Sequence, residues 1–412
     1  MRALTLPLDD PALAATGLAE AALDDIAGGD GMLFVRDGIG IAAHGTALTI
    51  DASEAALRLA ALPHDSRVHG VPLHPLAIGT VPFEPGAPSP LCVPVATVRH
   101  TDDGARALTI VAADPEAELE RLVADGHLRP TPRPVPRAQA FTVSPLTPVH
   151  RYLGAVTAAR DAVRAGELTK AVIAREVQVS SDEPIEVHAV LLRLRATFGR
   201  SHRYSIDGFV GASPELLVEV RGNTVRSLPL AGTTPRTGDP DTDRRAADEL
   251  LASEKNQIEH RVVIDMIHDT LLPWCSFLDW EPEPGIVSVA NVQHLATAME
   301  GHLSDPRPDV MQLVAALCPT PALGGFPRPE ALQLIAREEG FTRGRYGGAV
   351  GWVDAVGDGT WAVAIRCAEF STDRRSARLI AGGGIVADSE PLAELAETQA
   401  KLQAMLSAIV RA

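Results

Sequence analysis

The spacing of apolar residues predicts alternating helices and strands along most of the chain. In some stretches apolar residues recur every three or four positions, as on one helix face, and in others they alternate with polar residues or form short runs. We expect helices over residues 11–26, 53–61, 149–165 and 246–272 and from 391 onward, and strands over 31–36, 90–99, 107–112, 170–179, 224–230, 286–297, 344–354 and 360–370. This irregular order predicts an α+β fold with mostly antiparallel sheets.

A proline-rich segment interrupts this pattern. Residues 128–148 contain six prolines and must be largely extended, because proline cannot continue a helix or donate to a sheet. We therefore assign residues 1–140 to an N-terminal part of the sheet-and-helix body that ends in this crossing. Residues 141–412 form the region with the candidate chemistry.

The C-terminal stretch combines a glycine run with charged residues on one helix face. Three glycines, residues 382–384, end a predicted strand, and Pro391 suits the first turn of the helix that follows. On that helix Glu394, Glu397 and Lys401 are three and four residues apart, so they share one face. Alone, this pattern is also typical of an exposed face with ion pairs.

A second acidic residue, Glu259, lies at the edge of the apolar face of the helix predicted over residues 246–272. Burying an ionised carboxylate is costly unless it is paired or bound to a metal. Glu397 has a similar setting, and two such carboxylates brought together would repel unless a hard dication lay between them. Mg²⁺ fits best, because it takes oxygen ligands and keeps several waters. Arg366, in a predicted apolar strand, needs a carboxylate for the same reason.

Composition excludes several classes of function. The net charge of -16 argues against nucleic acid or an anionic membrane as a partner, because both are bound through clustered Lys and Arg. No apolar run reaches the roughly 18 residues that a membrane span needs. The four cysteines are too scattered for a zinc site or a disulfide framework. We expect a cytoplasmic protein, and a monomer because the chain has no heptad seam.

Eight motifs, taken together and in order, resemble those of the chorismate-utilising enzymes, most closely the isochorismate synthases. They are GASPELL (211–217), PLAGTTPR (229–236), SEKNQIEH (253–260), NVQHLAT (291–297), CPTPALGGFP (318–327), RYGGAVGW (345–352), AIRCAEF (364–370) and AGGGIV with the later E, ET and K (381–401). The resemblance implies a chorismate-binding fold: two antiparallel β-sheets packed as a sandwich, flanked by helices, with the active site between them.

The resemblance also implies how the site binds its ligands. It implies Mg²⁺ held by Glu259 and Glu397, with Glu394 nearby through water. It implies that one carboxylate of chorismate binds the metal and that the other meets basic side chains and backbone N–H groups. The residues implied to contact chorismate are Gly232, Thr233, His294, Ala322, Leu323, Tyr346, Arg366, Gly382 and Lys401. Relatives commonly carry an acidic residue at the position of Asn256, and the amide found here puts the outer shell of the metal in doubt.

Lys170 and Glu215 indicate the reaction. Lys170 matches the general base that activates water to attack ring C2, where ammonia-using relatives carry Gln. Ala231 stands where aminodeoxychorismate synthases carry a nucleophilic lysine. Glu215 matches the general acid that protonates the departing C4 hydroxyl, so it must stay protonated in a dry pocket. The resemblance thus implies Mg²⁺-dependent isomerisation of chorismate to isochorismate, without a glutamine amidotransferase subunit.

Two alternatives stay open. A salicylate synthase would form isochorismate and then eliminate pyruvate in the same site; Ala322 and Leu323 resemble the pure isomerases, whereas the bifunctional enzymes tend to carry Thr at position 322. A protein that binds chorismate without catalysis would keep the fold but needs neither Lys170 nor Glu215. His294 is either a residue that orients the C4 hydroxyl or a structural histidine. The pathway that consumes the product, for a siderophore, menaquinone or another metabolite, is also open.

Overall fold

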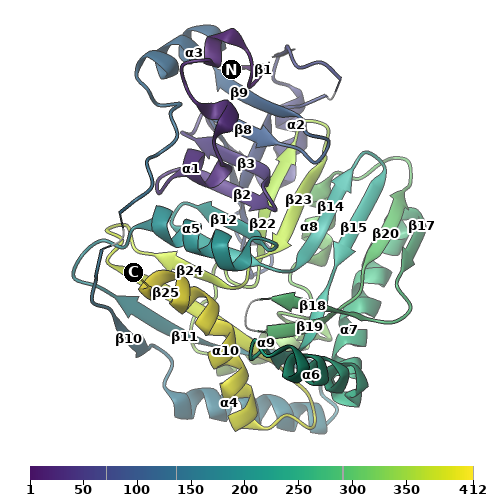
Figure 1. Cartoon of the computed structure of the whole chain (residues 1–412). Helices are drawn as coiled ribbons and strands as arrows, with labels where there is room; N and C mark the ends of the chain where they lie inside the picture. The colour runs from purple at the N-terminus through teal and green to yellow at the C-terminus, as the bar shows by residue number, and fades with distance from the viewer. Residues whose placement is uncertain (71, 136, 290–291, 412) are drawn as a thin grey trace.

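The computed structural model describes residues 1–70, 72–135, 137–289 and 292–411, and it has the α+β architecture expected from the sequence (Figure 1). Within these residues the strands form three sheets, and their neighbours run antiparallel apart from the parallel pair β1 and β5. The 13-stranded sheet has the order β10 (Thr142–Pro145), β11 (Lys170–Ser180), β25 (Ser376–Ile385), β24 (Cys367–Phe370), β13 (Phe209–Ser213), β12 (His202–Ile206), β2 (Met32–Arg36), β3 (Ile39–His44), β8 (Ala96–His100), β9 (Arg106–Ala112), β1 (Arg2–Pro7) and β5 (His64–Ser66), with β21 (Gly325–Phe326) beside β11.

The other two sheets are smaller. The 9-stranded sheet has the order β17 (Cys275–Trp280), β20 (Met299–Leu303), β15 (Thr224–Leu228), β14 (Leu216–Arg221), β23 (Gly359–Val363), β22 (Ala349–Asp354), β6 (Leu76–Val81), β7 (Pro90–Val93) and β4 (Leu48–Asp51). The 3-stranded sheet, which the sequence did not predict, has the order β16 (Leu230–Pro235), β19 (Val292–Ala296) and β18 (Gly285–Val289).

Helices flank the sheets. They are α1 (Leu23–Ala27), α2 (Ala55–Ala60), α3 (Pro115–Ala124), α4 (Val149–Arg164), α5 (Val187–Phe198), α6 (Pro240–Ala252), α7 (Glu254–Leu271), α8 (Val310–Leu317), α9 (Arg328–Glu338) and α10 (Pro391–Val410). Figure 1 shows α10 running beside α4 and next to β25. None of the described helices is both long and apolar enough to cross a membrane.

Two apolar cores hold these layers together. One contains side chains of both large sheets, such as Ile173 and Tyr204 from the 13-stranded sheet and Val350 and Trp361 from the 9-stranded sheet. The other joins the 13-stranded sheet to α5 and α10. Burial of apolar surface on both faces is the main stabilising contribution to such a layered fold. The predicted packing of two antiparallel sheets with flanking helices is therefore confirmed.

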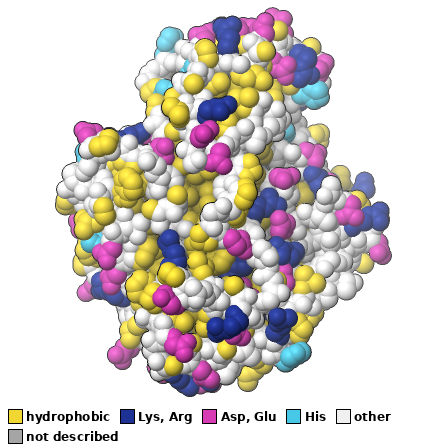
Figure 2. Space-filling model, turned by 180° about the vertical axis from the view of Figure 1, so that it is seen from behind, with side chains coloured by type: hydrophobic (Ala, Val, Ile, Leu, Met, Phe, Trp, Pro, Cys, Tyr) yellow, Lys and Arg dark blue, Asp and Glu magenta, His cyan; other side chains and the backbone are white. Residues whose placement is uncertain are grey.

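The segment before the proline-rich crossing contributes strands to both large sheets. Strands β1, β2, β3, β5, β8 and β9 belong to the 13-stranded sheet, and β4, β6 and β7 belong to the 9-stranded sheet. In Figure 1 the purple N-terminal strands lie in continuation of the later strands. On the face shown in Figure 2, Lys and Arg side chains are scattered among Asp and Glu and do not gather into one patch.

The prediction of one continuous helix over residues 246–272 is wrong, because the structure has two helices there. Ser253 has extended backbone angles and separates α6 from α7. Its hydroxyl accepts a hydrogen bond from the Asn256 amide, so it caps the N-terminus of α7. A serine is tolerated within a helix and favoured at its start, and the apolar spacing alone does not separate the two cases. The break gives α7 its own direction, and α7 carries Glu259.

Other expected elements are shorter or divided. The helix expected over residues 11–26 is reduced to two single turns and α1, because Gly17 adopts a left-handed conformation. The strand expected over 90–99 becomes β7 and β8, with Pro94 between them. The strand expected over 286–297 is the hairpin β18–β19, whose residues 290–291 lie outside the described part. The strand expected over 360–370 divides into β23 and β24, which belong to different sheets.

Candidate active site

A cavity forms where β25 of the 13-stranded sheet, β16 and β19 of the 3-stranded sheet, and the connections that carry Glu215 and Arg366 meet α7 and α10. Most of the predicted site residues line it: Glu215, Gly232, Thr233, Glu259, His294, Ala322, Leu323, Tyr346, Arg366, Gly382 and Lys401. Lys170 and Glu397 form ion pairs with lining residues, and Glu394 lies against the glycine run behind the wall. The chain therefore brings residues separated by more than 200 positions to one place.

The glycine run of β25 lets these charged groups approach the backbone. A Cβ atom on Gly384 would lie 2.3 Å from Glu259 Oε1 and 2.8 Å from Lys170 Cε. A Cβ atom on Gly383 would lie 2.8 Å from Glu394 Oε2. All three distances are shorter than real Cβ contacts, so a side chain at either position would displace the charged groups. The glycines are among the last four residues of β25, which ends at Ile385, so they stand at the end of this strand as expected.

Each of the three predicted metal carboxylates has a lysine partner. Lys170 Nζ lies 2.9 Å from Glu259 Oε1, and Lys401 Nζ lies 2.6 Å from Glu397 Oε1. Lys255, which the sequence analysis did not assign, lies 3.2 Å from Glu394 Oε1. Burial would raise the pKa of Glu259, but Lys170, Lys401 and Lys255 outweigh it and hold that pKa below its usual value.

Glu259, Glu394 and Glu397 suit Mg²⁺ in the chemical type of their ligating atoms. Glu394 is buried, and burial together with the neighbouring Glu397 raises the pKa of its carboxyl group, so a cation beside both would be stabilised. Their ligating atoms are all carboxylate oxygens, which suit Mg²⁺. Within the described residues, however, no three acidic, His or Cys side chains are already close enough to hold a metal ion. Metal binding would require these carboxylates to move closer together.

Glu215 occupies a much drier environment than Glu259. It lies between β13 and β14 with 2 % of its surface exposed, and its Oε1 atom has no hydrogen-bond partner. Burial raises its pKa to about 8, although a backbone hydrogen bond from Leu230 and the charge of Lys170 act in the opposite direction. A carboxyl group in this position is protonated at neutral pH and can donate its proton.

Arg366 lies in the connection between β23 and β24, not within a strand as expected. Its φ of 52° is in the left-handed region, which is unfavourable for a residue with a side chain and is often found at functional sites. One guanidinium nitrogen, Nη2, lies 3.0 Å from His294 Nε2, and the other, Nη1, is buried without a partner. The side chain thus presents an unpaired donor to the cavity that it lines.

His294 holds Arg366 in place. Burial and the nearby Arg366 and Lys401 hold the pKa of His294 well below its usual value, so the imidazole is neutral. Its Nδ1 lies 3.1 Å from Thr233 Oγ1 and 3.3 Å from the Gly232 carbonyl oxygen. Nδ1 therefore carries the proton, which leaves Nε2 to accept a hydrogen bond from Arg366. Both ring nitrogens have protein partners, which favours an orienting role toward Arg366.

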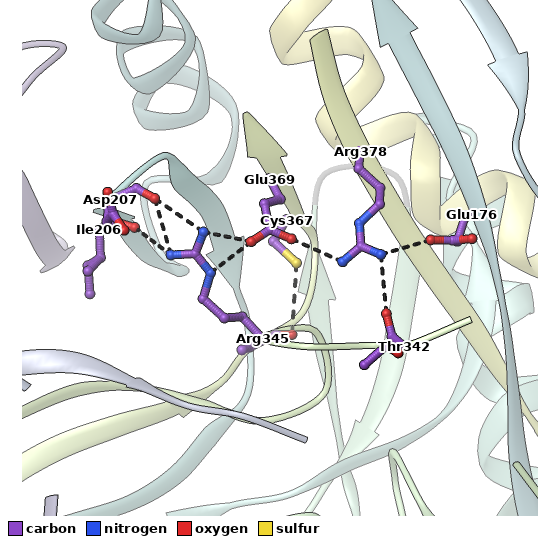
Figure 3. Close-up of polar contacts among 9 residues, drawn as sticks. Glu176, Ile206, Asp207, Thr342, Arg345, Cys367, Glu369 and Arg378 are labelled. Atoms are coloured by element: carbon purple, nitrogen blue, oxygen red, sulfur yellow. Dashed lines mark hydrogen bonds and ion pairs between the residues drawn. The ribbon is translucent and has the colours of Figure 1, made fainter. Parts of the chain in front are cut away.

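A chain of ion pairs supports the connection that carries Arg366 and the loop that carries Tyr346 (Figure 3). Arg345 donates to Glu369 at 2.7 Å and to the carbonyl oxygens of residues 206 and 207. Arg378 donates to the other oxygen of Glu369 at 3.0 Å and to Glu176 at 2.9 Å. Glu369 is thus shared by two guanidinium groups, one from the loop before β22 and one from β25.

Sequence reasoning missed several residues around the site. Lys255 lies within the SEKNQIEH motif, four positions before Glu259, so helical spacing could have placed both on one face. Ser389 donates a hydrogen bond to Glu394 at 2.7 Å and does not cap α10, whose first residue follows Glu390. Glu339 and Arg343, which are four residues apart, form a buried ion pair beside the site; their spacing is compatible with a pair, but nothing in the local sequence indicates its burial against β11.

Comparison with known proteins agrees with this geometry. The family model described as chorismate binding enzyme matches residues 82–410, which include every residue of the cavity. The chain belongs to this family. It is 36% identical to the isochorismate synthase DhbC of Bacillus subtilis over 81% of both chains, and 35% identical to the isochorismate synthase EntC of Escherichia coli over 85% of both.

The solved structures of this family show the same fold. The structure of MenF, the menaquinone-specific isochorismate synthase of Escherichia coli, superposes with a TM-score of 0.82 at 24% identity. The match covers 100% of this chain and 94% of MenF. Anthranilate synthase component I of Streptococcus pneumoniae superposes with a TM-score of 0.73 at 22% identity, over 89% of this chain and 92% of that chain.

The glycine run generates a prediction about stability. We expect Gly384→Ala to lower the free energy of unfolding by about 1–3 kcal/mol, because its Cβ atom would overlap Glu259 and Lys170. Gly285→Ala in β18 is the control, since a Cβ atom there meets nothing within 4 Å, and its effect should stay within about 0.5 kcal/mol. Denaturant unfolding of both variants measures the difference. Equal stability of the two variants would contradict the proposed crowding.

Proposed function

We propose that this protein converts chorismate to isochorismate. The observation that carries the proposal is the pairing, within one cavity, of a dry carboxyl group on Glu215 with an unpaired buried guanidinium nitrogen on Arg366. A donor without a partner is costly to bury, so Arg366 is suited to an anionic ligand. The identity to two relatives named isochorismate synthases supports this ligand and product.

In the proposed reaction Arg366 and Tyr346 bind the pyruvyl carboxylate of chorismate. Tyr346 lines the cavity, and burial raises the pKa of its hydroxyl group, so this group remains a hydrogen-bond donor at all physiological pH values. Lys401 adds positive charge and is itself held by the Gly382 carbonyl oxygen at 2.9 Å. Leu323 and Ala322 supply the apolar part of the wall. These groups position the ring, which lowers the entropic cost of reaching the transition state.

Two groups then move protons in the proposed reaction. Lys170, in its neutral amine form, takes a proton from water as the water oxygen bonds to ring C2, and Glu215 donates its proton to the C4 hydroxyl as the C4–O bond breaks. Both ring double bonds shift by one position, from C1=C2 to C1=C6 and from C5=C6 to C4=C5, so that one water enters, one leaves, and no electrons are gained or lost. Lys170 is buried at the first residue of β11, close enough to Glu215 to influence its pKa.

Mg²⁺ belongs to this proposal as the bound dication. Glu259 and Glu397 would hold it, with Glu394 behind them, and it would supply positive charge for the ring carboxylate of the substrate. The oxygen-only ligands and the raised pKa of Glu394 support this assignment. The three lysines keep the same carboxylates neutralised without the metal.

The reaction itself is tested by its product. With chorismate and Mg²⁺ the purified protein should form isochorismate, identified by chromatography, and added ammonium should not change the product, because Lys170 stands where ammonia-using relatives carry Gln. Pyruvate and salicylate in equal amounts would instead assign the salicylate synthase reaction. Tight binding of chorismate without any product would assign a binding protein.

The role of Glu215 as an acid can be measured directly. We expect its carboxyl group to be protonated at pH 7 and to ionise as the pH rises through about 8, because burial raises its pKa. Subtracting the infrared spectrum of Glu215→Gln from that of the wild type isolates the band of the protonated Glu215 carboxyl group. This band should disappear as the pH rises through about 8. Turnover of Glu215→Gln should fall about 100-fold or more, the usual contribution of a general acid.

The matched control for this experiment is Glu300→Gln, because the Glu300 side chain is 63% exposed on β20. It should show neither the band difference nor a loss of turnover. A Glu215 carboxyl that is ionised at pH 7, or a Glu215→Gln variant with normal turnover, would remove the acid assignment.

The metal assignment is tested by a substitution of the same shape that removes a charge. Glu397→Gln replaces a proposed anionic ligand with a neutral amide, so the Mg²⁺ concentration for half-maximal turnover should rise by about tenfold or more, and the Mg²⁺ affinity measured by calorimetry should fall equally. Glu390→Gln, an exposed residue immediately before α10, should leave both values unchanged. An unaltered Mg²⁺ titration of Glu397→Gln would contradict the ligand set.

A further inference from the structure

One edge of β11, the strand that begins with Lys170, is only partly covered by other strands. Its inner edge pairs with β25 from Ala171 to Ser180. On its outer edge β21 pairs with residues 170–171 and β10 with residues 177–180. Between them, in the described part of the chain, no strand pairs with the outer edge. The backbone groups of residues 172, 174 and 176 on this edge therefore need other partners.

A buried ion pair supplies two of these partners. The Ala174 amide donates to Glu339 Oε1 at 2.7 Å, and the Val172 carbonyl oxygen accepts from Arg343 Nη2 at 2.8 Å. Glu339 and Arg343 are bound to each other through both Arg343 Nε and Nη2, and each side chain is 1% exposed. The pair thus takes the place of a neighbouring strand along the middle of β11.

Arg343 also contacts the other walls of the cavity. Its Nη1 donates to the Leu323 carbonyl oxygen at 2.7 Å, and its guanidinium group lies 5.9 Å from the centre of the Tyr346 ring. The guanidinium group also lies over the Phe83 ring, 4.3 Å from the centre of that ring. Planar guanidinium groups can bond in several directions at once and stack on rings, which a lysine cannot do. One side chain therefore contacts three segments that form the site.

We propose that Arg343, held by Glu339, is the positioning residue that sets the distance between Lys170 on β11 and the Leu323 and Tyr346 side of the cavity. It lies outside the cavity lining and acts through the Val172 and Leu323 backbone and the Tyr346 ring. The expected effect on the rate rests on the proposed function. The distance between Lys170 and Tyr346 matters for turnover only if Lys170 acts on a ligand that the Tyr346 side of the cavity holds. A misplacement of about 1 Å in such a site typically costs about 100-fold in rate.

The neighbouring Arg345 provides an internal comparison. It lies on the same loop, but its ion pair with Glu369 is on the other side, toward β24, and its side chain is 20% exposed (Figure 3). It supports the loop from outside and has no hydrogen bond to β11 or to Leu323. The structure therefore assigns the spacing across the cavity to Arg343 and only general support of the loop to Arg345.

A second buried ion pair provides the matched control. Arg203 on β12 and Asp24 on α1 are bonded to each other with 2% and 3% of their side chains exposed. Neither residue lines the cavity. Arg203→Lys therefore disturbs an equally buried guanidinium group without touching the site, and it reports the loss that destabilisation alone would cause.

The experiment compares Arg343→Lys, Arg345→Lys and Arg203→Lys in the full chain with chorismate and Mg²⁺. We expect Arg343→Lys to lower kcat/KM by about 100-fold, with part of the loss in KM. Arg203→Lys should stay within about threefold of wild type at temperatures well below its Tm, and Arg345→Lys, which supports the same loop from the β24 side, should lose less activity than Arg343→Lys. A double-mutant cycle should show coupling between Arg343→Lys and Tyr346→Phe, and additive effects of Arg203→Lys and Tyr346→Phe.

Equal losses in Arg343→Lys and Arg203→Lys, or additivity with Tyr346→Phe, would overturn the positioning role. If Arg343→Lys does not fold, Glu339→Gln replaces it, because a glutamine can still accept from the Ala174 amide but no longer neutralises Arg343; it should reduce kcat/KM by about tenfold and show the same coupling. A wild-type protein that does not turn over chorismate would overturn the proposed function instead, which keeps the two failures distinct.

Discussion

Gly383 and Gly384 allow charged side chains from α7, α10 and β11 to lie directly against the backbone of one strand. Because these two residues carry no side chains, the carboxylates of Glu259 and Glu394 approach β25 more closely than any Cβ atom would permit. Isolated buried charges are unfavourable, but here each carboxylate has a lysine within ion-pair distance. The bare strand therefore makes it feasible to bury a cluster of alternating charges beside the cavity.

The two glutamates of the cavity wall show how surroundings divide the roles of one residue type. Glu259 has three lysines near it, and their charges keep it ionised despite burial. Glu215 has an unpaired oxygen atom, and burial outweighs the charges of Lys170, Arg366 and Lys401, so its pKa rises to about 8. Opposed shifts of this kind indicate an ionised ligand on one side and a proton donor on the other. The proposed isomerisation uses both.

Hydrogen bonds between segments that are distant in the sequence hold the residues of the cavity in position. Arg366 adopts a left-handed backbone conformation at a point where the chain leaves one sheet for the other, and His294 from the small third sheet holds its side chain. Glu339 and Arg343 complete the open edge of β11 and reach the opposite wall. Such buried polar contacts contribute to a unique arrangement because each lost partner would leave an unsatisfied group. The site depends on these contacts between distant segments more than on any single element.

The sequence by itself determined the class of the fold and most of the residues at the cavity. Periodicity predicted β11 and α10, and the ordered motifs identified Glu215, Glu259 and Arg366, because spacing along the chain is a local property that determines which face a side chain occupies. It did not predict the break at Ser253, which suits a helix cap as well as a helix interior.

Only the tertiary structure decided the partners. The lysines beside Glu259 and Glu394, the position of Arg366 between two sheets, and the contact of Arg343 with β11 join residues that are far apart in the chain. No local pattern encodes such a pair, since its members are brought together by sheet pairing and helix packing. Burial, and therefore the contrast between Glu215 and Glu259, also follows from that packing and not from the sequence around either residue.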